Sequence, residues 1–255
     1  MLNSTAIVKE AESVTGLTNL GNPLFIEGFH KLVDSINHEA DLTNMGIQAQ
    51  HHRLMGVLIN MLRLEAEVQQ HPDILDESIR TPVVIVGLPR TGSTMTHRLL
   101  AADPRHTAML WWEGRYPAML PGEQRGNPIE RMSLGKAEVE AVMAASPDAL
   151  SIHPWDYKGA DEEILLLEHT FFSTVPESFM RLPSYSAWVS QQDHEHAYKQ
   201  LKVMLQYLQW QNPGRAEKRW VLKSPHHLGF IDKLLMVFPD AKIIQTHRDP
   251  HKTVP

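Results

Sequence analysis

The stretch Pro82-Val83-Val84-Ile85-Val86-Gly87-Leu88-Pro89-Arg90-Thr91-Gly92-Ser93-Thr94 decides the fold of this chain. Residues 82–87 are short, continuous, β-branched and bounded by proline and glycine, which is typical of a strand buried on both faces of a parallel sheet. A glycine loop follows at once, and the apolar spacing from Thr94 to Ala102 predicts a helix. This order of strand, loop and helix presents backbone N–H groups to an anion at the start of the helix.

The loop has the glycine spacing of the phosphate-binding P-loop, G-x-x-x-x-G-K-[ST], with one departure. Gly87 and Gly92 are five positions apart, but Ser93 stands where the lysine belongs. That lysine reaches the β- and γ-phosphates of a nucleotide, so its loss argues against ordinary ATP or GTP hydrolysis. Arg90, inside the loop, supplies a planar cation instead. We therefore expect the loop to hold a short anionic group at the 5′ end of a nucleotide.

Two more strands are predicted late in the chain, at Arg219–Lys223 and Ala241–Thr246, with a helix from Leu228 to Phe238 between them. Apolar residues recur at intervals of three and four over residues 23–70, which indicates helices. The middle of the chain, residues 129–211, reads as mostly helical. Its clearest helices are Asp161–Phe172 and His194–Trp210. We predict an α/β fold: a P-loop-type parallel sheet flanked by helices, with a helical N-terminal preface and a helical insertion.

Composition narrows the class of protein. The 255 residues include 24 Lys plus Arg and 30 Asp plus Glu, and this net charge of -6 argues against a protein that coats nucleic acid. The chain has no cysteine, which excludes disulfides and thiolate sites. Neither a secretory signal nor an apolar run near the roughly 18–20 residues of a membrane span is visible. We expect a cytoplasmic protein without a membrane span.

The loop Pro89-Arg90-Thr91-Gly92-Ser93-Thr94 resembles the 5′-phosphosulfate loop of sulfotransferases that use 3′-phosphoadenosine 5′-phosphosulfate (PAPS), in the version found in bacterial and tyrosyl-protein enzymes. His247-Arg248-Asp249-Pro250 after a strand resembles the second family element, whose arginine binds the nucleotide 3′-phosphate. The resemblance covers about residues 80–255. It implies one sulfotransferase-like domain over 1–255, with a helical preface (1–78) and a nucleotide-binding core (79–255). The family's 3′-phosphate serine would fall at position 256, so the resemblance also implies a C-terminally truncated core and an activity in doubt.

The same resemblance implies the groups that carry the chemistry. Arg90 and Lys223 would neutralise the transferring sulfuryl group, Lys223 because it ends a strand as the family lysine does. Either His153 or Glu113 would take the acceptor proton; an imidazole titrates near neutral pH, whereas a glutamate needs burial to do so. Asp161-Glu162-Glu163 resembles an acidic motif of the bacterial enzymes, but a carboxylate-rich helix N-terminus is the simpler interpretation.

The resulting hypothesis is a PAPS-dependent sulfotransferase acting on a hydroxyl of a small molecule, glycan or lipid. No metal is expected, since His194-Glu195-His196 and His226-His227 lack zinc-site spacing. Two alternatives stay open: a divergent P-loop kinase or nucleotidase, and an inactive α/β interaction module. The acceptor and the oligomeric state, a homodimer included, cannot be deduced from the sequence.

Overall fold

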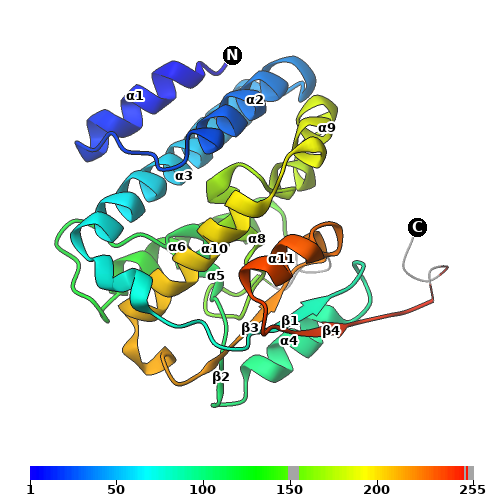
Figure 1. The fold of residues 1–255 in the computed structure, drawn as a ribbon. Coiled ribbons are helices and arrows are strands. Elements are labelled where there is room, and N and C mark those ends of the chain that lie inside the picture. The colour runs from blue at the N-terminus through cyan, green and yellow to red at the C-terminus, as the bar shows by residue number, and fades with distance from the viewer. Residues whose placement is uncertain (149–154, 250, 252–255) are drawn as a thin grey trace.

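The computed structural model describes residues 1–148, 155–249 and 251, and its centre is a parallel sheet. The strands run in the order β2-β3-β1-β4 (Figure 1). Their bounds are β1 Val83–Val86, β2 His106–Thr107, β3 Arg219–Lys223 and β4 Lys242–Gln245. Val84 lies opposite Leu222 on one side and Ile243 on the other, both in parallel register. The predicted α/β class with a parallel sheet is confirmed. The short edge strand β2 was not predicted.

Both faces of β1 are buried, as its unbroken apolar sequence predicts. Val84 and Val86 belong to the main apolar core, together with Leu222 of β3. Val83 and Ile85 point the other way and pack toward Leu100 of α4 (Ser93–Ala101). The alternation follows from the two-residue period of a strand. Helix α4 therefore covers one face of the sheet, while α10 (Glu195–Gln211) and α11 (Ile231–Val237) lie on the other (Figure 1).

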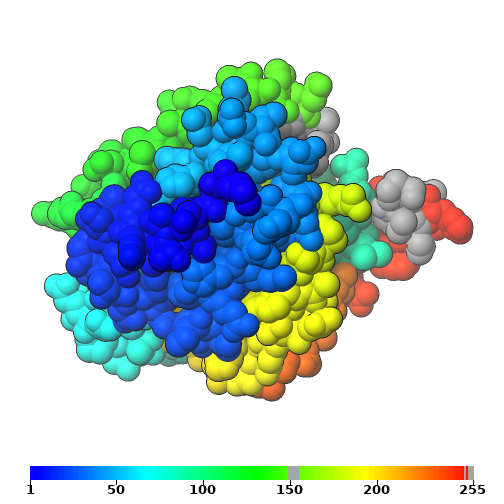
Figure 2. All heavy atoms as spheres, turned by 90° about the horizontal axis from the view of Figure 1, so that it is seen from above, coloured from blue at the N-terminus to red at the C-terminus, as the bar shows by residue number. Residues whose placement is uncertain are grey.

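Three helices form the preface: α1 (Ser4–Thr15), α2 (Pro23–Glu39) and α3 (Asn44–Gln70). Each begins after a side chain that accepts a hydrogen bond from the first turn, namely Asn3, Asn22 and Thr43. The stretch predicted as helical, residues 23–70, thus forms two helices, α2 and α3. Helix α1 lies before this stretch and was not predicted. In space-filling view the preface covers a broad face of the molecule (Figure 2).

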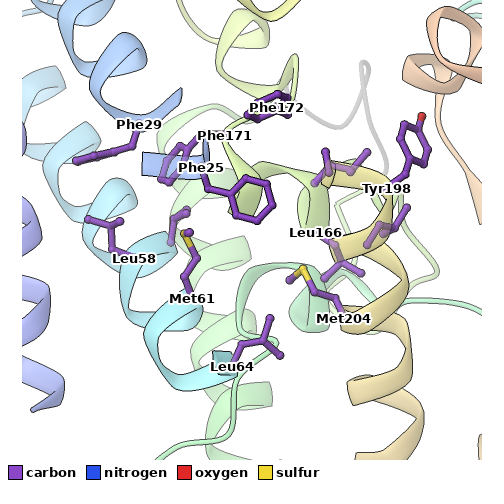
Figure 3. Close-up of a cluster of buried hydrophobic side chains, with 14 of the residues drawn as sticks. Phe25, Phe29, Leu58, Met61, Leu64, Leu166, Phe171, Phe172, Tyr198 and Met204 are labelled. Carbon is purple, nitrogen blue, oxygen red and sulfur yellow. The ribbon is translucent and has the colours of Figure 1, made fainter. Parts of the chain in front are cut away.

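Aromatic side chains join the preface to the rest of the chain. Phe25 and Phe29 of α2 meet Phe172 and Phe171, with ring centroids 6.1 and 5.1 Å apart (Figure 3). One continuous cluster of buried apolar residues runs from Leu2 to Phe238. The preface thus packs against the same core that supports the sheet.

The predicted helix over Asp161–Phe172 is mostly wrong. Only Ile164–Leu167 is α-helical (α8), and a 3-10 turn covers Glu168–Thr170. Phe171 then takes a left-handed conformation with φ 56°. This turn lets Phe171 and Phe172 enter the aromatic cluster, and burying the two rings outweighs the local helical pattern.

The remaining helices connect these parts. They are α5 (Trp111–Arg115), α6 (Ile129–Ala145) and α9 (Pro183–Gln191), with 3-10 turns at Pro72–Asp76, Val175–Ser178, Pro213–Arg215 and Pro225–Gly229. None of the helices in the described part of the chain combines the length and apolar character needed to cross a membrane.

Candidate active site

The loop after β1 is held closely against the end of β4. A Cβ atom at position 87 would lie 2.2 Å from Thr246 Oγ1 and 2.8 Å from the Thr246 carbonyl oxygen, so only glycine fits there. The hydroxyls of Thr91 and Thr246 are hydrogen-bonded at 2.7 Å, and the Thr246 N–H donates to the Val86 carbonyl. Gly87 therefore allows the loop after β1 to pack directly against the end of β4.

The loop ends in an open helix N-terminus. Gly92 precedes α4 with φ 92°, and among the described residues no side chain caps this end of the helix. The first-turn N–H groups are consequently free to bind an anion. Arg90 also has a positive φ, 69°. That conformation costs a non-glycine residue about 1–2 kcal/mol, and such strain is concentrated at functional loops.

Arg248, beyond the end of β4, reaches the same loop. Its Nη1 donates to the Arg90 carbonyl oxygen at 3.3 Å. Both arginines are exposed to solvent. Two motifs separated by more than 150 positions thus meet at one edge of the sheet, because the carboxyl ends of the parallel strands β1 and β4 lie there.

Lys223 approaches α4 from the end of β3. Its side chain is 2 % exposed, and Nζ lies 3.4 Å from Thr94 Oγ1. Nζ also forms an ion pair with Glu162. The lysine is therefore a buried cation at the first turn of α4, and not a solvated lysine at the rim of the sheet.

The carboxylates of Glu162 and Glu163 belong to this site, which corrects their interpretation as the N-terminal charges of their own helix. No side chain caps α8, the short helix that follows them. Glu163 Oε2 instead accepts the Lys223 backbone N–H at 2.8 Å, and its other oxygen contacts the His227 ring. The correction arises from contacts between residues about 60 positions apart, which no local pattern signals. The one local signal in the sequence was that two adjacent glutamates precede an apolar run.

Burial acts differently on the two carboxyl groups. It raises the pKa of Glu162, and the Lys223 charge offsets this only in part. For Glu163, burial alone would raise the pKa as well, but the contact with His227 outweighs it and the pKa is lowered. Tyr198 completes the group, with its hydroxyl 2.7 Å from His227 Nδ1. Glu163 is thus a fixed anion that holds β3, whereas Glu162 lies nearer to titration at neutral pH.

Glu113 lies in a different environment from the loop residues. It is buried in α5, where its carboxylate accepts the Leu110 N–H at 2.8 Å and an N–H of Arg215 at 2.9 Å. The other candidate base, His153, lies outside the described residues. The structure thus brings Arg90, Lys223 and Arg248 to the loop, while the described hydrogen bonds of Glu113 tie it to Arg215.

A parallel sheet with a glycine loop at the carboxyl end of its first strand defines a fold of the P-loop type. Residues 82–255 match the family model described as the sulfotransferase family. The chain belongs to the sulfotransferase family, as its motifs predict.

Two solved mycobacterial structures are similar to nearly the whole chain. Sulfotransferase STF1 of Mycobacterium tuberculosis is 31% identical with a TM-score of 0.84, over 98% of this chain and 68% of that one. Sulfotransferase STF9 of Mycobacterium avium is 29% identical with a TM-score of 0.85, over 99% of this chain and 64% of that one.

Curated relatives agree with this. Omega-hydroxy-beta-dihydromenaquinone-9 sulfotransferase Stf3 of Mycobacterium bovis and of Mycobacterium tuberculosis are each 29% identical over 179 residues. The match covers 68% of this chain and 43% of the relatives, so the chain spans less than half of their length.

Proposed function

We propose that this chain binds PAPS and transfers its sulfuryl group to a hydroxyl acceptor. The observation that carries the proposal is the convergence of three cations on one loop: Arg90 within it, Arg248 on its carbonyl at 3.3 Å and Lys223 at Thr94 at 3.4 Å. They come from three separate strand ends, and together they suit a nucleotide with anionic groups at both its 3′ and 5′ positions.

Each group has a role in this scheme. The loop of residues 89–94 begins at Pro89, which fixes the backbone but has no N–H to donate. The N–H groups and hydroxyls of the residues after it, Arg90, Thr91, Gly92, Ser93 and Thr94, hold the 5′-phosphosulfate. Arg248 binds the 3′-phosphate. In the reaction the bond from sulfur to the bridging oxygen of the donor breaks, and a bond from sulfur to the acceptor oxygen forms. Arg90 and Lys223 neutralise the transferring sulfuryl group and the charge that collects on the phosphate left behind, and the scheme uses no metal.

The acceptor proton needs a base, for which His153 and Glu113 are our candidates from the sequence. The structure adds Glu162, because burial raises its pKa and it contacts Lys223. Both glutamates are paired with a cation, Glu162 with Lys223 at the donor loop and Glu113 with Arg215. The variants Glu162→Gln, Glu113→Gln and His153→Gln distinguish the three. The variant that removes the base should lower the single-turnover rate about 10²-fold or more, and its rate should no longer fall as the pH is lowered. The other two variants should keep this fall in rate at low pH.

The acceptor is proposed as a class. The name of Stf3 assigns it a hydroxyl on a menaquinone-derived lipid. By analogy we propose a hydroxyl on a lipid or other small molecule for this chain, with a glycan as a further option. A sulfation screen over these classes with labelled donor is the direct measurement.

Nucleotide binding tests the donor assignment. In titration calorimetry, 3′,5′-adenosine diphosphate should bind at least tenfold more tightly than 5′-AMP, and Arg248→Ala should remove this preference because it removes the 3′-phosphate partner. ATP with Mg²⁺ should bind more weakly. Tighter binding of ATP would contradict the proposal and favour a kinase or nucleotidase. Arg90→Ala should abolish transfer with the fold intact. In an inactive interaction module, which keeps the loop only as architecture, the same variant would change stability at most.

A further inference from the structure

A second, strongly basic pocket lies at the far end of α4. It has a volume of about 500 Å³. Five of its lining side chains carry or can acquire positive charge: Arg98, His106, Lys158, Arg215 and Lys218. Asp156 is the single carboxylate among its lining residues. In a chain with net charge -6, such a concentration of cations marks a place that attracts anions.

This pocket is separate from the donor loop. The loop lies at the N-terminus of α4, whereas the pocket is lined by Ala101 and Ala102 at the C-terminus. Eight residues of helix at about 1.5 Å each separate the two ends by about 12 Å. The neighbouring strand β2 also meets the start of β3, not its end (Figure 1). The pocket and the donor loop therefore lie at opposite ends of α4.

Arg215 is a buried, positively charged side chain in the lining of the pocket. Its side chain is 7 % exposed, and its guanidinium lies 5.2 Å from the centre of the Trp220 ring. Glu113 takes one N–H of the guanidinium at 2.9 Å, but Nη1 is buried with no hydrogen-bond partner in the described part of the chain. Nη1 is enclosed by protein atoms and out of reach of a ligand in the pocket, so Arg215 acts on the pocket through its positive charge, which Glu113 compensates in part.

The basic surface continues past the pocket. A neighbouring hollow of about 650 Å³ shares His106 and Lys218 with it and is also lined by Arg80, Arg105 and Arg219. Glu217 is the only carboxylate that lines the hollow. Part of this charge is already compensated, because Arg105 pairs with Asp103 at 2.5 Å. A ligand with more than one anionic group can therefore place one group in the pocket and another toward the hollow.

We propose that the pocket lined by Arg98, Lys158, Arg215 and Lys218 binds a small polyanion that carries phosphate or sulfate groups. The proposal uses no residue of the donor loop; its one link to the proposed reaction is Arg215, which is paired with the candidate base Glu113. Ligand binding would join the end of α4, β2 and the segments 156–160 and 212–218, and so stabilise the folded chain.

Titration calorimetry and thermal unfolding with inorganic pyrophosphate test this. The double variant Lys158→Ala/Lys218→Ala should raise the pyrophosphate Kd at least tenfold and remove the rise in Tm. The exposed pair Lys136→Ala/Lys199→Ala is the matched control, and it should stay within twofold of the unmodified chain. With saturating 3′,5′-adenosine diphosphate present, so that pyrophosphate cannot occupy the donor loop, the unmodified chain should keep this Kd, and Arg90→Ala/Arg248→Ala, which removes the donor-site cations, should stay within twofold of it. Inorganic sulfate in place of pyrophosphate compares the two oxyanions.

A gain of affinity provides a second test that misfolding cannot imitate. Asp156→Asn keeps the oxygen that accepts the Lys158 N–H at 3.0 Å but removes the pocket's carboxylate. It should tighten pyrophosphate binding about threefold or more. A threefold or smaller effect of the Lys158/Lys218 variant, loss of binding in Arg90→Ala/Arg248→Ala, or no saturable binding below about 1 mM would each overturn the proposal.

Discussion

Lys223 is held by partners from two directions, and both of its interactions bear on function. Its Nζ lies 3.4 Å from Thr94 Oγ1 on the helix that follows the loop, and it forms an ion pair with Glu162. A buried ammonium is tolerated only where such partners compensate for its lost hydration. Lys223 therefore links the proposed donor site to a carboxylate whose pKa burial raises.

Removing the charge of Lys223 separates its two roles. Lys223→Met should lower sulfuryl transfer about 10²-fold or more and destabilise the fold by about 1–3 kcal/mol, because Glu162 loses its counter-ion. Lys223→Met/Glu162→Gln should recover most of the stability in urea unfolding without recovering transfer. Equal instability of the single and double variants would argue against the ion pair as the cause.

His169 makes stability depend on pH. Its Nδ1 lies 3.0 Å from the Leu165 carbonyl oxygen and Nε2 is 3.2 Å from the Asn60 amide nitrogen, an arrangement that suits a neutral ring. Burial lowers its pKa from 6.5 to about 4. The unfolded chain thus takes up a proton near pH 6.5 that the folded chain refuses until about pH 4, so acid favours unfolding.

We expect the free energy of unfolding to fall by about 3 kcal/mol from this histidine as the pH drops from 6.5 to 4. Urea unfolding at several pH values measures it. His169→Gln cannot titrate at this position, so its free energy of unfolding should fall less steeply with pH. The slopes of the two proteins should differ by up to about 1.4 kcal/mol per pH unit. Identical slopes for the two proteins would show that His169 is not responsible.

At the scale of elements, the loop between β1 and α4 depends on close contact with β4. Position 87 has no room for a Cβ atom, because Thr246 lies 2.2 Å from where it would be. Gly56, within α3, has nothing within 4 Å of its Cβ position. Glycine is therefore required sterically at position 87, which follows β1, but not at position 56, which lies within α3.

Alanine at these positions should have opposite effects. Gly87→Ala should destabilise the chain by about 1–3 kcal/mol and weaken binding of 3′,5′-adenosine diphosphate, because the loop must move away from β4. Gly56→Ala should stabilise it by up to about 1 kcal/mol, since alanine is the better helix former. Thermal unfolding and nucleotide titration measure both, and a nucleotide affinity of Gly87→Ala equal to that of Gly56→Ala would refute the role of the close contact.

At the scale of the molecule, buried charges as well as apolar contacts connect the preface to the core. Arg53 of α3 donates two hydrogen bonds to Glu168, at 2.6 and 2.7 Å, and Arg115 of α5 contacts the same carboxylate at 3.5 Å. Burial alone would raise the pKa of Glu168, but the two arginines outweigh it and the pKa is lowered. We propose that residues 1–255 form one domain and unfold as one unit.

Two spectroscopic signals test this unit. All six tryptophans lie between Trp111 and Trp220. Fluorescence therefore reports mainly the core, with Trp188 beside Gly28 of α2 as the exception, whereas far-UV circular dichroism includes the preface helices. The two urea transitions should coincide. Loss of helix before the change in fluorescence would show that the preface unfolds separately.

The sequence by itself determined the parts whose information is local. The apolar run 83–86, the glycines of the loop and the short apolar stretches of β3 and β4 specify strands and a helix start over a few neighbouring residues, and the family motifs lie in or next to them. The preface helices were predicted over 23–70 for the same reason, since their apolar faces repeat at helical spacing.

Only the tertiary structure decided which distant groups meet. Glu162 and Glu163 contact Lys223 because α8 begins only at Ile164, which leaves the acidic pair in the segment beside the end of β3. Glu113 meets Arg215, about 100 positions away, where α5 passes the segment before β3. Such pairings depend on how the whole chain buries its apolar surface, because desolvation and Coulomb attraction act through space and leave no local pattern in the sequence.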